Sequence, residues 1–432
     1  MNELSRRAVL AAGLASSLVA SNAVSAAVHP LKPRHDTAPD VLARDEAYWH
    51  SVATQYDVSR EVVELENAYW GVMAKPVETA YVQHQLTVNQ RGSFYARREF
   101  DADLERIRQR VATKLGVASE EIALTRGATE AMQLLIGGYN RLAPGDAVLY
   151  SDLDYDSMQM AMNWLPTRRG VDVVRITLPE PATYQGLIDA YAAALDAHPR
   201  VRLILLTHVS HRTGLVLPIK EIVAMARARG VDAVVDSAHA WGQIDFRLDD
   251  LGADFVGLNL HKWMGAPLGV GVLYIRRARI NAIDVFMANE EFPADDVRAR
   301  VHTGTTDFAT VLTVAEALDF QDLLGIPAKE ARLRYLRDLW VVPLRARGRL
   351  EILTPQDPRL YCAITSFRLP GRTSAADNAA VVKDLLDRFR IFTVHRTGVA
   401  SGACVRVTPA VFTSAAEIQQ LAHALEQIAS PA

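Results

Sequence analysis

The feature that most constrains the fold is a regular alternation of short apolar runs with longer amphipathic segments. The runs are continuous in Val, Leu, Ile and Ala, which is typical of strands buried on both faces. Seven such strands are predicted, at residues 122–125, 147–150, 171–177, 201–207, 233–235, 255–258 and 270–275. Helices are predicted between them, at residues 129–142, 156–166, 184–198 and 218–229. Alternation of this kind predicts an α/β fold with a mainly parallel sheet covered on both faces.

The pattern changes after residue 305. Helices are then predicted at 310–323, 329–345, 375–389 and 415–428, and strands at 362–368, 391–394 and 405–408. This mixture predicts a small α+β domain. A further helix is predicted at 102–115, before the first strand. The expected parts are a signal peptide at 1–27, an irregular N-terminal arm at 28–64, a large domain at 65–305 and a small domain at 306–432.

The N-terminus has the pattern of an export signal. Ser5-Arg6-Arg7 precedes an apolar run at residues 8–20, and the small residues Val24-Ser25-Ala26 follow. The run is short and rich in Ala, Gly and Ser, so it is poorly suited to span a membrane. The paired arginines match a twin-arginine signal, and an ordinary secretory signal or an uncleaved anchor are the alternatives. We therefore expect the twin-arginine export machinery as a partner and the periplasm as the location.

Charge and cysteine content exclude several classes of function. The 432-residue chain has a net charge of −3 and 50% hydrophobic residues, which is an ordinary soluble balance. No basic surplus points to nucleic acid. The two cysteines, Cys362 and Cys404, form neither a disulfide framework nor a zinc spacing, and we expect no metal site.

Three motifs indicate the chemistry. The strand in "AVVDSAHAWGQ" ends in Asp236, and the carboxyl end of a parallel strand is where open α/β sheets bind ligands. Lys262, in "GLNLHKWMGAP", follows the next strand, and a desolvated lysine becomes a nucleophilic amine that forms Schiff bases. In "LTRGATEAM", Gly127, Ala128 and Thr129 join a strand to a helix whose free N–H groups suit a phosphate. Taken singly, each motif also fits a turn residue, a solvated lysine or a simple helix cap.

Together and in this chain order, the three motifs meet the needs of pyridoxal 5'-phosphate (PLP). The aspartate keeps the pyridine nitrogen protonated, so that the ring can accept electrons. The lysine holds the aldehyde, and the helix terminus holds the phosphate. The sequence therefore predicts PLP as the cofactor.

The segments "VVDSAHAWGQ" and "GLNLHKWMGAPLGVGVLYIRR" resemble the class V aminotransferase family of fold-type I PLP enzymes. That family includes cysteine desulfurases, kynureninase-like enzymes and isopenicillin N epimerase-like proteins, and the last branch is the most similar. The resemblance extends from "LENAYWGVM" to the last predicted helix. Some exported members of this group tailor siderophore peptides, as in pyoverdine maturation, and the export signal favours the same context here.

The resemblance implies a role for several side chains at the cofactor. Lys262 would form the Schiff base and later act as general acid and base, and Asp236 would pair with the pyridinium. His239 would stand near the phenolic oxygen, where His211 replaces an asparagine common in desulfurases, and Tyr155 would stack on the ring. The residues expected around the phosphate are Gly127, Ala128, Thr129, Asn259 and His261.

The resemblance also implies contacts with the substrate and with a second subunit. Arg406, in "GACVRVTPAVF", would bind the α-carboxylate, a task that suits a bidentate guanidinium. Asn67, in "LENAYWG", would lie near the mouth of the site. Thr305, in "HTGTTD", would reach the phosphate of a neighbouring subunit, which implies a homodimer with shared active sites.

We therefore expect a PLP-dependent enzyme, an aminotransferase, epimerase or lyase, that acts on an amino-acid or peptidyl-amine substrate through an external aldimine. One alternative is a cysteine desulfurase or C–S lyase. A desulfurase needs a mobile cysteine well before the carboxylate arginine, whereas Cys404 stands only two residues before Arg406. The other alternative is a non-catalytic PLP-fold binding or sensor protein, which would not need both Asp236 and Lys262.

Two questions stay open at this point. The residues do not determine which bond at Cα is broken, because transamination, racemisation, decarboxylation and C–S cleavage share a first step. Three arginines in "NQRGSFYARREF" fit either an acidic group of the substrate or surface salt bridges. They are Arg91, Arg97 and Arg98.

Overall fold

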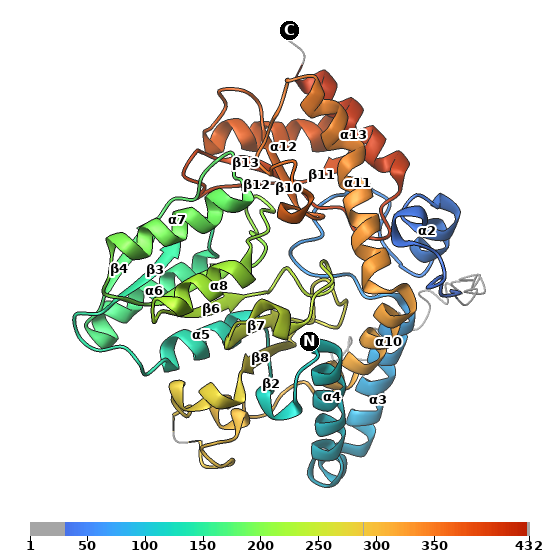
Figure 1. The fold of residues 1–432 in the computed structure, drawn as a ribbon. Helices are drawn as coiled ribbons and strands as arrows, with labels where there is room; N and C mark the ends of the chain where they lie inside the picture. The colour runs from blue at the N-terminus through green and yellow to red at the C-terminus, as the bar shows by residue number, and fades with distance from the viewer. Residues whose placement is uncertain (1–30, 288, 430–432) are drawn as a thin grey trace, which may run out of the picture. The chain divides into compact units, whose positions relative to one another are not determined.

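The computed structural model describes residues 31–287 and 289–429, so the predicted signal peptide lies outside the described residues. A seven-stranded sheet forms the centre of the large part of the chain (Figure 1). Its strands are β2 (Ile122–Thr125), β3 (Ala147–Ser151), β4 (Asp172–Ile176), β5 (Val201–Thr207), β6 (Asp232–Asp236), β7 (Phe255–Asn259) and β8 (Gly271–Ile275). The strand order is β2-β8-β7-β6-β5-β3-β4, and only β8 runs antiparallel to its neighbours. The predicted α/β fold with a mainly parallel seven-stranded sheet is confirmed.

Helices cover both faces of this sheet. They are α5 (Ala128–Gly138), α6 (Asp156–Arg169), α7 (Tyr184–Ala197) and α8 (Ile219–Ala228). On β5, Leu203 and Leu205 pack in the core that contains α5 and α6. The alternate residues Ile204 and Leu206 pack in the core that contains α7 and α8. Because successive side chains point to opposite faces, burial of both faces explains the unbroken apolar runs.

The N-terminal segment is more regular than the sequence predicts. The arm, expected to be irregular, contains α1 (Pro39–Leu42) and α2 (Glu46–Ala53). Asp45 caps α2 by accepting a hydrogen bond from the Tyr48 N–H at 3.0 Å, and buried Trp49 donates to the Leu42 carbonyl at 2.7 Å. Two long helices follow before the sheet, α3 (Lys75–Arg98), which is kinked at Gly92, and α4 (Phe100–Leu115).

The C-terminal part contains a second, smaller sheet with its own apolar core. Its strands are antiparallel in the order β12 (Val394–Arg396), β13 (Cys404–Val407), β10 (Thr365–Arg368) and β9 (Glu351–Ile352). A two-stranded parallel sheet joins β1 (Val63–Glu64) to β11 (Ile391–Phe392). The helices are α9 (Phe308–Leu312), α10 (Val314–Leu324), α11 (Ile326–Ala346), α12 (Ala375–Phe389) and α13 (Ala415–Ile428).

From Leu31 onward the chain forms one compact unit, and the division expected at residue 305 stays a prediction. Within the described ranges, no helix combines the length and the apolar character needed to cross a bilayer. The same residues contain no group of His, Cys, Asp or Glu side chains arranged to hold a metal ion.

Candidate active site

One pocket lies at the carboxyl edge of the large sheet and has a volume of about 1650 Å³. Three parallel strands end there, β5 at Thr207, β6 at Asp236 and β7 at Asn259, and all three residues line the pocket. The turn from β2 into α5 reaches the same edge because β2 and β7 both pair antiparallel with β8. The sheet therefore brings together the three motifs that the sequence singled out.

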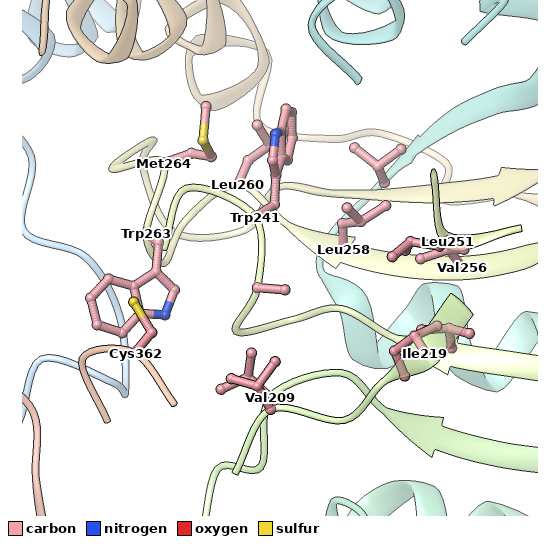
Figure 2. Packing of buried hydrophobic residues seen from close by; sticks show 14 of the residues in the cluster. Val209, Ile219, Trp241, Leu251, Val256, Leu258, Leu260, Trp263, Met264 and Cys362 are labelled. Carbon is pink, nitrogen blue, oxygen red and sulfur yellow. The ribbon is translucent and has the colours of Figure 1, made fainter. Parts of the chain in front are cut away.

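Lys262 belongs to a loop that is packed into the core on both sides of the lysine. Figure 2 follows this packing from Val256 and Leu258 on β7 to Leu260, Trp263 and Met264 in the loop. Those apolar neighbours are buried, whereas Lys262 lines the pocket. The loop at residues 260–266, hereafter the lysine loop, thus fixes the lysine at the pocket by burying the residues around it.

Backbone hydrogen bonds hold the lysine loop from several distant segments. The His261 carbonyl accepts from the Gly71 N–H at 2.9 Å, the Trp263 carbonyl from the Lys329 amine, and the Met264 carbonyl from the Gln321 side-chain amide at 3.0 Å. Within the loop, the Lys262 carbonyl accepts from the Gly265 N–H at 3.0 Å. Gly71 approaches so closely that a Cβ there would lie 1.8 Å from the Lys262 carbonyl oxygen. Residues from before the large sheet and from α10 and α11 therefore position the lysine.

The environment of Lys262 shifts the pKa of its amine toward neutral pH. Burial lowers the pKa of Lys262 to about 8, and the negative charge of Asp236 partly opposes this effect. Its Nζ lies 2.9 Å from Nε2 of His239. Burial and the charge of Lys262 hold the pKa of His239 well below its ordinary value, so His239 is neutral. A neutral imidazole beside the amine can accept or return a proton.

Asp236 is a buried carboxylate with one close partner. It accepts a hydrogen bond from the Ala238 N–H at 2.9 Å. Burial raises the pKa of Asp236, and the Ala238 N–H and Lys262 act in the opposite direction. A buried carboxylate is costly without a cation or several donors, and this one faces the pocket. The site therefore favours a ligand that brings a positive charge to Asp236.

The turn before α5 differs from the expected phosphate site in one respect. The N–H of Ala128 donates to Oδ1 of Asn259 at 2.7 Å, so this N–H is not free for a phosphate, whereas the Nδ2 amide of Asn259 is. Thr129 lines the pocket, and its side-chain hydroxyl makes no hydrogen bond with any described residue. His261 uses Nδ1 on the Val270 carbonyl at 3.0 Å, which leaves its other nitrogen available. The Thr129 hydroxyl and the Nδ2 amide of Asn259 therefore remain as phosphate donors, whereas burial lowers the pKa of His261 and its free Nε2 accepts a hydrogen bond in the neutral ring.

Gly127 allows these groups to come together, because a Cβ there would lie 3.2 Å from both Oδ1 of Asn259 and Cε1 of His261. On the opposite side of the pocket, Tyr155 and His211 meet edge to face with ring centroids 5.0 Å apart. Burial lowers the pKa of His211 to about 3, although Asp156 opposes the shift. His211 is therefore neutral and has an N–H to offer to an oxygen of a ligand.

Of the two residues expected to contact the substrate, Arg406 lines the pocket and Asn67 does not. Arg406 lines the pocket, donates to the His211 carbonyl at 2.6 Å and forms an ion pair with Glu66. The Asn67 side chain is buried beside the pocket and donates to the carbonyls of Glu64 (3.1 Å) and Thr408 (2.9 Å). Its amide is therefore used for packing, and the residues that line the mouth are the next two, Ala68 and Tyr69.

Other expected residues lie outside the pocket of this chain. Thr305 is exposed and does not line it, so its contact with a neighbouring subunit stays a prediction. Arg91 pairs with Glu99, and Arg97 and Arg98 are exposed on α3, away from the pocket lining. The salt-bridge interpretation therefore fits Arg91.

The sequence did not reveal Arg396, Glu66 or Lys329. Arg396 lines the pocket from β12, Glu66 pairs with Arg406, and Lys329 holds the lysine loop. Each acts on a residue distant in the chain, so no local motif marks it. Only the short spacing of "HRTGVASGACVRV" hints that two arginines, Arg396 and Arg406, share a hairpin.

The pocket has the donors and acceptors that PLP needs. Several buried polar atoms around Lys262 lack a hydrogen-bond partner among the described residues. They are Nδ1 of His239, both nitrogens of His211, Oγ1 of Thr207 and Nε of Arg406. With a lysine of lowered pKa, a buried carboxylate and the N-terminus of α5 in one cleft, fold and site define a fold-type I PLP enzyme.

Comparison with known proteins gives the family. The model of the class V aminotransferases matches residues 75–421. Isopenicillin N epimerase from Streptomyces clavuligerus is 33% identical over 350 residues, which cover 77% of this chain and 86% of that protein. A cysteine desulfurase from Pectobacterium atrosepticum is 27% identical over 374 residues, 81% of this chain and 88% of that protein.

Solved structures share the fold. The apo cysteine desulfurase from Thermococcus onnurineus superposes with a TM-score of 0.76 at 20% identity, covering 87% of this chain and 97% of that one. The chain belongs to the class V aminotransferase family, and it is a PLP-dependent enzyme of the isopenicillin N epimerase-like branch.

Proposed function

We propose that the protein is an exported, homodimeric enzyme that acts at the Cα–amine of an amino acid or of a peptidyl amine, in the tailoring of a siderophore or another secondary metabolite. The observation that carries the chemistry is the meeting of Lys262, Asp236 and His239 in one pocket. The likeness to isopenicillin N epimerases supports a tailoring role, and the twin-arginine pattern supports export.

When bound, PLP supplies an electron sink for the carbanion formed at Cα. Asp236 would stabilise the protonated ring nitrogen through its charge, in a site where burial makes that charge effective. Tyr155 and His211 would lie beside the ring, and Thr129, Asn259 and His261 would surround the phosphate. Arg406 orients the substrate by its carboxylate.

Lys262 moves the proton. Because burial lowers the pKa of Lys262 to about 8, roughly a tenth of its amines is neutral at pH 7 and can accept a proton from Cα. His239, 2.9 Å away, provides a second position for that proton. The bond that breaks depends on how the pocket orients the substrate, and epimerisation and transamination use the same groups.

A cysteine desulfurase or C–S lyase is the second candidate, because cysteine desulfurases are among the relatives. The two cysteines of the chain do not support a persulfide-forming desulfurase. Both are buried away from the pocket, and burial raises the pKa to about 12 for Cys362 and about 11 for Cys404. Release of sulfide from cysteine or cystine by the purified enzyme, with no turnover of amino acids that lack sulfur, would favour the lyase.

The test of the main proposal is covalent attachment at Lys262. The purified protein should show a visible absorbance band that borohydride abolishes, and peptide mass analysis should place the reduced cofactor on Lys262. Lys262→Ala should lose this attachment, whereas Lys220→Ala, at an exposed lysine of α8, should retain it. A protein that stays colourless with added PLP, or that carries the label elsewhere, would overturn the proposal.

Export and assembly have separate tests. Replacement of Arg6 and Arg7 by lysine should keep the protein in the cytoplasm, and no change in location would refute the twin-arginine route. The native mass should equal two chains, and Thr305→Ala should weaken PLP retention. A monomer that retains PLP fully would refute the shared site.

A further inference from the structure

Two arginines reach the pocket from neighbouring strands of the small sheet. In the antiparallel pair β12–β13, Val394 lies opposite Arg406, and Arg396 lies opposite Cys404. Side chains two positions apart on a strand share a face, so Arg396 and Arg406 are diagonal neighbours on one face. Both line the pocket that contains Lys262.

The two arginines differ in what they contact. Arg406 is buried and committed to Glu66 and to the His211 carbonyl, and only its Nε lacks a partner. Arg396 is half-buried and, within the described part of the chain, makes no hydrogen bond or ion pair. A fork of N–H donors therefore faces the pocket without an acceptor.

The charges at this end of the pocket do not balance. Two guanidinium groups face one carboxylate, that of Glu66, which leaves one positive charge uncompensated. The next carboxylate, Asp156, also attracts Arg396, but it forms its ion pair with Arg212. An uncompensated charge in a partly desolvated cleft is costly, and an anion from the ligand removes that cost.

We propose that Arg396 and Arg406 together form the receptor for one carboxylate of the substrate, and that Glu66 positions Arg406 and rejects a second carboxylate. Arg396 supplies the free fork, and Arg406 adds its unpartnered Nε–H. This inference rests on the proposed function and specifies its substrate as an amine with a single carboxylate close to the reacting carbon. Arg396 and Glu66 thereby determine specificity alongside Arg406.

The test measures anion binding without turnover. Propionate, a monocarboxylate that lacks an amine, is titrated into the PLP-loaded enzyme while the pH midpoint of the visible absorbance band is followed. An anion bound near Lys262 favours the protonated form of the chromophore and raises this midpoint. The midpoint approaches a limit as the propionate concentration rises, and this dependence gives the dissociation constant. Arg396→Met should weaken propionate binding by about tenfold or more, and Arg396→Lys by less, because charge is kept and the fork is lost.

The matched control is Arg168→Met. Arg168 lines the same pocket but is exposed and stacks on Trp164, with its guanidinium carbon 4.7 Å from the ring centroid. Its loss should change propionate affinity less than about twofold. Unchanged affinity in Arg396→Met, or equal weakening in both variants, would overturn the role of Arg396.

Succinate tests Glu66. The wild-type enzyme should bind propionate in preference to succinate, and Glu66→Gln should bind succinate at least about tenfold more tightly than wild type does. An unchanged succinate affinity in Glu66→Gln would overturn the role of Glu66. A protein with no visible band fails the proposed function itself, whereas a normal band with unaltered affinities fails only this inference.

Discussion

The substitution Lys329→Met tests the most unusual buried charge in the fold. Lys329 lies on α11 with a relative exposure of 4%, and its amine donates to the Trp263 carbonyl and, at 2.9 Å, to Oε1 of Gln321. No carboxylate pairs with it among the described residues. Burial lowers the pKa of Lys329 from 10.5 to about 7.

The magnitude follows from this pKa difference. Between pH 7 and 10.5 the unfolded chain binds a proton at Lys329 that the folded chain does not, so the free energy of unfolding rises with pH across this window. The slope is half of its full value at pH 7 and approaches about 1.4 kcal/mol per pH unit above pH 8, which gives about 2 kcal/mol from pH 7 to pH 9. Methionine removes this term but leaves the carbonyl of Trp263 without a donor, which costs about 1–3 kcal/mol.

At pH 7 these two effects on stability oppose each other, so the change of stability with pH is the diagnostic quantity. Denaturant unfolding of wild type and Lys329→Met at pH 7, 8 and 9 gives the difference in unfolding free energy at each pH. We expect the unfolding free energy of wild type to rise by about 2 kcal/mol relative to that of the variant over this range. Lys383→Met, at a lysine of α12 whose side chain is 75% exposed, is the control and should show no such gain. A difference that is constant with pH would refute the reasoning, because it would mean that Lys329 keeps its proton when folded.

Three further substitutions test the site. Gly71→Ala places a Cβ 1.8 Å from the Lys262 carbonyl oxygen and should lower the melting temperature and PLP retention. The control Gly137→Ala, inside α5, should instead stabilise the fold by about 0.5–1 kcal/mol. Equal effects of the two substitutions would contradict the close approach of Gly71. Asp236→Asn removes the charge that we expect to pair with the ring nitrogen and should lower kcat by about 10²–10³-fold, measured at saturating PLP. A smaller loss would speak against that contact. Cys404→Ala should leave turnover within about twofold of wild type, because the thiol is buried and protonated. Denaturant unfolding should show a stability loss of about 1 kcal/mol. Abolished turnover would identify Cys404 as a nucleophile.

The sequence predicts the large sheet well, and also the edge of that sheet at which the candidate active site lies. Strands such as β5 are fully apolar because both faces are covered, and this pattern is visible without a structure. Asp236 and Lys262 follow strands whose ends meet at one edge, so their proximity follows from topology. The long helix α3 was missed because most of its residues are polar and exposed, and it therefore lacks an apolar stripe.

The finer parts of the site depend on contacts between distant segments. Ala128 resembles a phosphate donor in sequence, but Asn259, which follows 131 residues later, takes its N–H. Asn67 resembles a substrate residue, but the Thr408 carbonyl takes its amide. Hydrogen-bond partners of this kind are decided by tertiary packing, and local patterns do not record them.

The bonds that hold the lysine loop also determine how much of the chain must be present before the pocket exists. Gly71 contacts the loop from the N-terminal side, and Lys329 contacts it from α11. Arg406 closes the pocket from a strand near the end of the chain. A growing polypeptide therefore lacks part of the pocket until almost its whole length has been synthesised. No fragment from either half of the gene can reproduce the pocket, and cofactor capture becomes a late event that reports on a completed fold.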